Sequence, residues 1–382
     1  MFSLFENIHN ENTVYDTMPK IQTLGLFLIF IYFIFALFII GFLSVAYLQF
    51  LHLCDVINQH KRIKILRQQK NENSIEHHFT VSGIDKNTPF NEIKFIATHN
   101  SHKKLPSKLA LAFLHLHQKN IAKQLSYQHE NLWNQLNSGI RSFELDIRHY
   151  SRKILVNHVP LVDNRTTSPL FKYALEEIFI WSKQHPNHFP ITVLLELKND
   201  YRILAPFSKP VNLRMLELIE DNILEVFPTQ NIFKPDDLRI HGMTLEQSIK
   251  KHGWPSLQEM KGKVIFLLHK DPILIEYEKK YHNLQDSYMF ITKENMDEGS
   301  PFLLMNNPYS KCIKKAVEQN YIIRTRADED LNNNKERHHK ALASGAQIIS
   351  TDYPPGNNFI DPSQVLSFGN NKTISRSLPN EK

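Results

Sequence analysis

Between residues 93 and 352 the chain repeats one pattern, in which a short apolar run is followed by a stretch with helical spacing of its apolar residues. The apolar runs predict strands, and the helical stretches between them predict a parallel sheet. The predicted helices include 170–185, 212–226, 310–319 and 334–343. The predicted strands are 93–99, 141–148, 154–159, 191–197, 264–270, 302–306, 321–326 and 347–352. Eight strands of this kind predict an α/β fold, a (β/α)8 barrel of the TIM type.

This predicted barrel is irregular at one point. The connection between the strands 141–148 and 154–159 is too short to contain a helix. A parallel pair needs a crossover of a dozen or more residues. We therefore expect a departure from the regular barrel between these two strands.

A longer apolar segment precedes the barrel. Residues 24–48 contain no charged side chain, and they exceed the ~18 apolar residues expected of a membrane helix. A signal-peptide core has only about 7 to 15 apolar residues, so the segment predicts an uncleaved transmembrane anchor. The small residues Ser44, Val45 and Ala46 leave cleavage of a signal segment open.

The composition around the anchor predicts the remaining boundaries. The basic stretch 60–70 follows the anchor, and acidic residues precede it. The positive-inside rule therefore places the barrel in the cytoplasm. The predicted parts are an N-terminal segment (1–23), the anchor (24–48), a polar and basic linker (49–90), the barrel domain (91–365) and a mobile tail (366–382).

Composition excludes several classes of function. The 382 residues carry a net charge of +6, without the clustered basic stripe and interleaved aromatic residues typical of nucleic-acid binding. The 11 glycines form neither of the glycine-rich phosphate loops of nucleotide-binding proteins. The two cysteines, Cys54 and Cys312, lie too far apart in sequence to indicate a disulfide framework or a zinc site. The oligomeric state stays open.

The predicted strand 141–148 directs charged side chains to one face. Side chains alternate between the two faces of a strand, so Glu144, Asp146 and Arg148 share a face, and the apolar residues between them share the other. Two carboxylates directed the same way are candidate metal ligands. Arg148 offers an alternative, in which it neutralises the pair and the cluster is a structural ion network.

Further polar side chains occur at the C-terminal ends of the predicted strands, where the active sites of barrel enzymes lie. Hard oxygen ligands favour Ca²⁺ or Mg²⁺, and Ca²⁺ tolerates irregular geometry better. The candidate ligands of this type are Asn100, Glu144, Asp146 and Glu196.

Histidines and cationic side chains also occur at or near the C-terminal ends of the predicted strands. His99 and His158 can act as acid and base near neutral pH. Arginine and lysine side chains can bind anionic oxygens, and the candidates are Lys198, Lys270, Arg324 and Arg326. A metal, two histidines and several cations together are suited to displacement at a phosphodiester, because the metal polarises the phosphoryl group.

Several motifs resemble a known family. They are IATHNSH, GIRSFELDIR, VNHVPLVDNRTTSPLFKYALEEIFIWSKQHPNHFPITVLLELK, RTRADED and ASGAQIISTDYP. In this order they look like calcium-dependent phosphatidylinositol-specific phospholipase C, in its stand-alone barrel branch. The resemblance covers roughly residues 90 to 360. It implies a phospholipid substrate, with phosphatidylinositol cleaved to diacylglycerol and inositol phosphate.

The resemblance also assigns roles to individual residues. It implies that His99 stabilises charge on the phosphoryl group or helps to deprotonate the attacking hydroxyl, and that His158 protonates the leaving glycerol oxygen. Metal-free bacterial relatives have an arginine where this chain has Asp146, which favours the metal-dependent type. The implied calcium ligands are Asn100, Glu144, Asp146 and Glu196. The implied phosphate contacts are Lys198 and Lys270, and the implied headgroup contacts are Arg324 and Tyr353.

Alternatives to this interpretation stay open. The stretch NHVPLVDNRTT is similar to glycerophosphodiester phosphodiesterases, but the chain has HNSH where that family usually has His-Arg-Gly, and it lacks the later Glu-Asn-Thr. A catalytically inactive, membrane-tethered lipid-binding barrel is a second alternative. The headgroup and its phosphorylation state are open. The stand-alone branch is generally exported, so we favour export of the barrel over the cytoplasmic location that the charges indicate.

Overall fold

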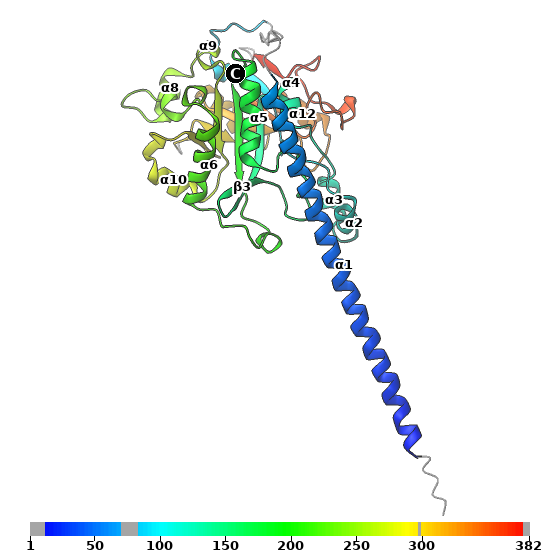
Figure 1. Cartoon of the computed structure of the whole chain (residues 1–382). Helices are drawn as coiled ribbons and strands as arrows, with labels where there is room; N and C mark the ends of the chain where they lie inside the picture. The colour runs from blue at the N-terminus through cyan, green and yellow to red at the C-terminus, as the bar shows by residue number, and fades with distance from the viewer. Residues whose placement is uncertain (1–11, 70–82, 297–298, 377–382) are drawn as a thin grey trace, which may run out of the picture. The chain divides into compact units, whose positions relative to one another are not determined.

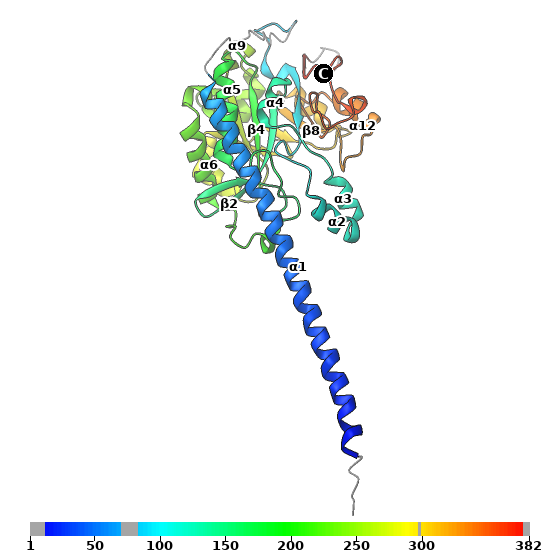
Figure 2. The ribbon, with the colours of Figure 1, turned by 45° about the vertical axis from the view of Figure 1, so that its right-hand side comes forward.

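The computed structural model describes residues 12–69, 83–296 and 299–376 (Figures 1 and 2). The chain divides into two units, Met1–Phe50 and Leu51–Lys382. Helix α1 (Asn12–Gln68) contributes to both. Its apolar part has exposed side chains and a mean hydropathy of 3.0, which is sufficient to cross a membrane, although a signal sequence has the same properties.

The second unit contains a closed barrel of eight parallel strands. The ring closes between β1 and β2 through one residue pair, Ala97 with Ser142. Two further strands of the described chain pair antiparallel at the edges, β3 (Lys153–Val156) with β2 and β10 (Ile374–Arg376) with β1. The parallel strands, in ring order, are β1 (Ile93–Thr98), β2 (Ser142–Tyr150), β4 (Ile191–Leu197), β5 (Val264–Leu268), β6 (Met289–Lys293), β7 (Phe302–Leu304), β8 (Ile322–Arg326) and β9 (Ile348–Thr351).

Helices surround this barrel, as the ribbon in Figures 1 and 2 shows. The α-helices after α1 are α2 (Lys108–His117), α3 (Lys119–Gln124), α4 (Leu132–Asn137), α5 (Phe171–Gln184), α6 (Leu213–Val226), α7 (Pro235–Leu238), α8 (Leu245–His252), α9 (Leu257–Met260), α10 (Leu274–Lys280), α11 (Cys312–Glu318) and α12 (Lys335–Ala343). The 3₁₀ helices are η1 (Phe90–Glu92), η2 (Arg202–Leu204), η3 (Thr229–Asn231), η4 (His282–Leu284) and η5 (Pro362–Gln364).

The core forms between the strands and these helices. Helix α5 buries Ala174, Ile178 and Trp181, whose spacing of three or four residues places them on one face. In β2 the apolar residues Phe143 and Leu145 are also buried in this core. The opposite face of β2 is thus free to direct its charged residues into the barrel, as the alternation in sequence predicts.

The structure corrects two strand predictions. The run 154–159 is not a barrel strand, because it forms the short hairpin strand β3 against β2. The barrel strand β6 was not predicted, because its apolar core, Met289–Ile291, is short and polar residues follow it. The predicted helices 170–185, 212–226, 310–319 and 334–343 correspond to α5, α6, α11 and α12.

The predicted linker 49–90 is partly wrong. Its first part, Leu51–Gln68, is helical, belongs to the barrel unit and lies beside α5 (Figures 1 and 2). We call it the docked segment of α1. One face of this segment is buried, and it consists of Asp55, Gln59, Ile63 and Leu66. Their spacing of three or four residues explains why a segment of polar composition packs against the barrel. Residues 70–82 of the predicted linker lie outside the described residues.

The predicted mobile tail, 366–382, is also partly wrong. Within it, Ile374–Arg376 forms strand β10, which pairs with β1. The side chain of Ile374 is largely buried, so this part of the tail is tied to the barrel. Residues 377–382 lie outside the described residues.

Candidate active site

Three carboxylates from two neighbouring strands meet inside the barrel. Glu144 and Asp146 point the same way from β2, two residues apart. Glu196 on β4 is the register partner of Asp146. Each carboxylate has an oxygen within 4.8 Å of an oxygen of the other two. The period of β2 and its register with β4 therefore build an acidic cluster, which we define as Glu144, Asp146 and Glu196.

Two cationic side chains face this cluster. Lys198 Nζ lies 2.7 Å from Glu196 Oε1 and 3.6 Å from Asp146 Oδ2. Arg324 on β8 forms an ion pair and hydrogen bond with Glu144. Arg148 does not neutralise the cluster, because its guanidinium turns to Asp200 Oδ1 at 2.8 Å. The alternative in which Arg148 neutralises Glu144 and Asp146 is therefore wrong.

The cluster does not readily carry three negative charges. Burial, together with the charge of Asp146, raises the pKa of Glu196 to about 7. Burial also disfavours ionised Glu144, but Arg324 outweighs this effect and lowers its pKa. For Asp146 burial acts in the same direction, and Lys198 outweighs it and lowers the pKa. A hard cation would relieve this repulsion, and a donor set made only of oxygens fits Ca²⁺.

Asn100 joins the cluster from a turn. Strand β1 ends at Thr98, and Asn100 has a left-handed backbone with φ of 45°. Asparagine adopts this conformation more readily than most residues. Its side-chain amide lies 3.2 Å from both carboxylate oxygens of Asp146 and 3.0 Å from the hydroxyl of Tyr127. The sequence predicts Asn100 as an oxygen ligand, and the structure places its amide beside Asp146.

His99 lies between an aspartate and an arginine. Its Nδ1 is 2.8 Å from Asp352 Oδ1, and its Nε2 is 3.2 Å from Nη1 of Arg326. Because a guanidinium only donates, the Nε2 accepts and the proton belongs on Nδ1, toward Asp352. Burial, followed by the charge of Arg326, lowers the pKa of His99 well below its usual value. His99 is thus a neutral imidazole with an accepting Nε2.

The surroundings of His158 shift its pKa in the opposite direction to that of His99. Its Nδ1 lies 2.7 Å from Asp163 Oδ2, and its Nε2 lies 4.0 Å from Asp146 Oδ2. Burial disfavours the charged ring, but the hydrogen bond to Asp163 and the charge of Asp146 outweigh it and raise the pKa of His158. A pair of titratable groups with pKa values shifted in opposite directions is the arrangement expected of an acid and a base.

The remaining predicted site residues lie differently. Lys270 is exposed and pairs with Glu294, not with the acidic cluster. Tyr353 donates its hydroxyl hydrogen bond to the carbonyl of Leu331, and burial raises its pKa to about 12. Arg324 is engaged by Glu144, as described above. The roles of Arg324 and Tyr353 as substrate contacts stay predictions, and the position of Lys270 apart from the acidic cluster disfavours its predicted role as a phosphate contact.

Sequence reasoning missed three partners of the site. Asp352 follows β9 and binds His99, and Asp163 binds His158. His102 is buried with neither ring nitrogen hydrogen-bonded, and its Nε2 lies 3.8 Å from Asp146. A signal existed for two of them, since Asp352 is the last residue of the predicted strand 347–352 and Asp163 stands five residues after His158.

Comparison with known proteins identifies the family. The sequence model of the family described as phosphoinositide phospholipase C, Ca²⁺-dependent, matches residues 88–153 and 150–377, which is more than half of the chain. The chain belongs to this family. It is therefore a phosphodiesterase of the calcium-dependent phosphoinositide phospholipase C family, and the acidic cluster is a site that can hold its metal. No curated protein matches the chain.

Solved structures of two calcium-dependent phospholipases C have a similar fold. The calcium-dependent phosphoinositol-specific phospholipase C from Pseudomonas sp., a Gram-negative bacterium, is 18% identical with a TM-score of 0.52, over 77% of this chain and 98% of the other. The Ca²⁺-dependent phosphatidylinositol-specific phospholipase C from Streptomyces antibioticus is 15% identical with a TM-score of 0.53, over 76% of this chain and 100% of the other. At such identities the likeness shows the fold, an α/β barrel.

Proposed function

We propose that this phospholipase C family member is a membrane-anchored enzyme that cleaves phosphatidylinositol-type phospholipids to diacylglycerol and inositol phosphate. The observation that carries the proposal is the oxygen-lined acidic cluster flanked by two histidine–aspartate pairs, His99 with Asp352 and His158 with Asp163. An arrangement of this kind is suited to displacement at phosphorus with general acid–base help.

The two histidines divide the proton transfers between them. In this tautomer the accepting Nε2 of His99 can take the proton of the attacking hydroxyl, whereas stabilising charge on the phosphoryl group would require a protonated ring. His158, whose pKa is raised, donates a proton to the glycerol oxygen as the P–O bond breaks. Asp352 and Asp163 hold the two rings in the tautomers that these roles require.

Calcium would be held by Asn100, Glu144, Asp146 and Glu196. When bound, it polarises the phosphoryl group and lowers the pKa of the attacking oxygen. Lys198 and Arg324 lie beside these ligands, where they offset negative charge and can bind phosphate or headgroup oxygens.

Exposed apolar side chains near the barrel rim support a lipid surface as the site of action. Helix α2, which follows β1, exposes Phe113 and Leu116 at 55% and 83%. The segment after β4 exposes Ile203 and Phe207 at 89% and 82%. Both segments follow the C-terminal ends of barrel strands, where the active site lies. Exposed apolar clusters are typical of membrane contact sites.

The apolar part of α1 supports permanent attachment to that membrane. Its length and hydropathy are sufficient to span a bilayer. We propose that it is an uncleaved anchor and that the barrel is on the exported side.

Phospholipid profiling tests this proposal. The full chain in detergent micelles is given phospholipids of different headgroups, with Ca²⁺ or with excess chelator, and the products are identified. We expect diacylglycerol and inositol phosphate from phosphatidylinositol, only with Ca²⁺. Cleavage of glycerophosphodiesters in place of lipids would assign the chain to the alternative reaction. Lipid binding without turnover of any phosphodiester would mean an inactive lipid-binding barrel.

A further inference from the structure

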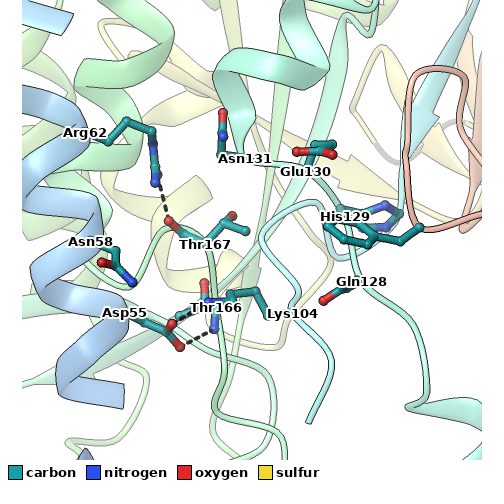
Figure 3. A pocket seen from close by; sticks show the side chains of 11 residues that line it. Asp55, Asn58, Arg62, Lys104, Gln128, His129, Glu130, Asn131, Thr166 and Thr167 are labelled. Carbon is teal, nitrogen blue, oxygen red and sulfur yellow. Dashed lines mark hydrogen bonds and ion pairs between the residues drawn. The ribbon is translucent and has the colours of Figure 1, made fainter. Parts of the chain in front are cut away.

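The docked segment of α1 binds the main chain of the loop between β3 and α5, residues 157–170. Gln59 makes two hydrogen bonds with Leu170, donating to its carbonyl at 3.1 Å and accepting from its N–H at 2.8 Å. Arg62 donates to the carbonyl of Thr167 at 2.7 Å (Figure 3). The helix therefore supplies a hydrogen-bond partner for the N–H of Leu170 and for the carbonyl of Thr167, and it adds a bond to the Leu170 carbonyl, which also accepts from the first turn of α5.

A buried carboxylate forms the centre of this contact. Asp55 is 2% exposed and accepts hydrogen bonds from Lys104 Nζ at 2.6 Å and from Nε of Arg165 at 2.6 Å. It also accepts from the backbone N–H of Thr166 at 3.3 Å (Figure 3). Breaking a buried charge pair by removing one partner is strongly unfavourable. Asp55 is thus a fixed attachment point for the middle of the loop.

The same loop carries the proposed general acid. His158 and its partner Asp163 both belong to it, and Asp163 stands two residues before Arg165. Asp163 is also bound by Lys103 Nζ at 2.5 Å, while the neighbouring Lys104 binds the helix. Lys103 thus holds Asp163, and the neighbouring Lys104 holds α1.

We propose that the docked segment of α1 is a positioning element for the general acid, with Asp55, Gln59 and Arg62 as the positioning residues. They hold the β3–α5 loop so that Asp163 keeps the ring of His158 aimed at the leaving oxygen. The inference rests on the proposed function. The docked segment lies outside the residues 88–377 that the family match covers, so it is a feature of this chain and not of the matched family region.

This role predicts a loss that depends on the leaving group. A displaced general acid slows release of an alkoxide, which needs a proton, and hardly affects release of a phenolate that leaves without one. Misplacement by about 1 Å can cost ~10²-fold. A purely structural role of α1 would lower both rates by the same factor, because it would reduce only the amount of folded protein.

The test uses the full chain in detergent micelles with Ca²⁺ and two soluble inositol phosphodiesters, one that releases butanol and one that releases 4-nitrophenol. The variants are Asp55→Asn and Gln59→Ala, with His158→Ala as the reference for loss of the acid. Arg67→Ala is the matched control. It removes an ion pair between α1 and Glu176 of α5, at 2.5 Å, that does not involve the β3–α5 loop.

We expect Asp55→Asn and Gln59→Ala to lower kcat for the butyl ester about 10-fold more than for the nitrophenyl ester, in the same direction as His158→Ala. Arg67→Ala should keep the wild-type ratio. Equal losses on both esters, or no loss in either variant while His158→Ala shows the split, would overturn the inference and leave the proposed function intact. If the wild-type chain cleaves neither ester nor phosphatidylinositol, the proposed function itself fails. Thermal melting of each variant identifies any that does not fold, and the other variant then decides.

Discussion

At the scale of single residues, each carboxylate of the site lies beside a cationic side chain. Each charged side chain of the acidic cluster has a partner, since Arg324 faces Glu144, and Lys198 faces Asp146 and Glu196. The pKa of Glu196 nevertheless stays raised, because two cations do not offset three carboxylates in a poorly solvated interior. A divalent cation held by these carboxylates would supply the missing positive charge.

Lys198 and Lys270 allow a matched comparison at this scale. Lys198 Nζ lies 2.7 Å from Glu196, inside the site, whereas Lys270 forms an exposed ion pair with Glu294. We expect Lys198→Met to lower kcat on phosphatidylinositol by ~10²-fold, as for loss of one electrostatic stabiliser in an active site. Lys270→Met should change kcat by less than about threefold, because exposed ion pairs contribute at most ~1 kcal/mol. Steady-state kinetics of both variants check this, and a larger loss for Lys270→Met would place it in the substrate site.

At the scale of elements, the period of a strand explains much of the site. Alternation in β2 places Glu144 and Asp146 together, and the sequence alone predicts this. It does not predict Glu196 as the register partner of Asp146, because register depends on pairing between strands far apart in sequence. Asp163 and Asp352 were missed for a related reason, since their contacts are made by loops whose path local spacing does not determine.

The docked segment of α1 shows where composition misleads. Its polar and basic residues predict a linker, but the face formed by Asp55, Gln59, Ile63 and Leu66 is buried. The spacing of these four residues indicates a helix with one buried face. Because two of them are polar, a search for periodic apolar residues does not detect this face. A buried face of this composition needs specific hydrogen-bond partners, which no single sequence reveals.

Truncation tests this element. A chain that begins at residue 51 keeps the docked segment and should be soluble and folded without detergent. A chain that begins at residue 85 lacks it and should melt at a lower temperature, because burial of Ile63 and Leu66 each contributes ~1.5–3 kcal/mol. Differential scanning calorimetry of the two chains measures the change. Equal melting temperatures would show that the segment adds nothing to the stability of the barrel.

At the scale of the whole molecule, eight parallel strands bring residues from β2, β4 and β8 to one interior site, although these strands lie far apart in the sequence. The alternation of strands and helices predicts the barrel, and the structure confirms it. The sequence predicts eight barrel strands, which is the correct number for the wrong reason. It includes 154–159, which forms the hairpin strand β3, and it omits the barrel strand β6.

The central claim is that turnover requires calcium held by the acidic cluster, and one titration tests it directly. Cleavage of phosphatidylinositol by the full chain is measured against free Ca²⁺, for the wild type and for Asp146→Asn. We predict no turnover in excess chelator, full recovery on adding Ca²⁺, and a higher half-activating Ca²⁺ concentration for the variant, because it loses a charged ligand. Full turnover in chelator, with Asp146→Asn only less stable, would mean that Arg324 and Lys198 make the cluster a structural ion network, and would contradict the account.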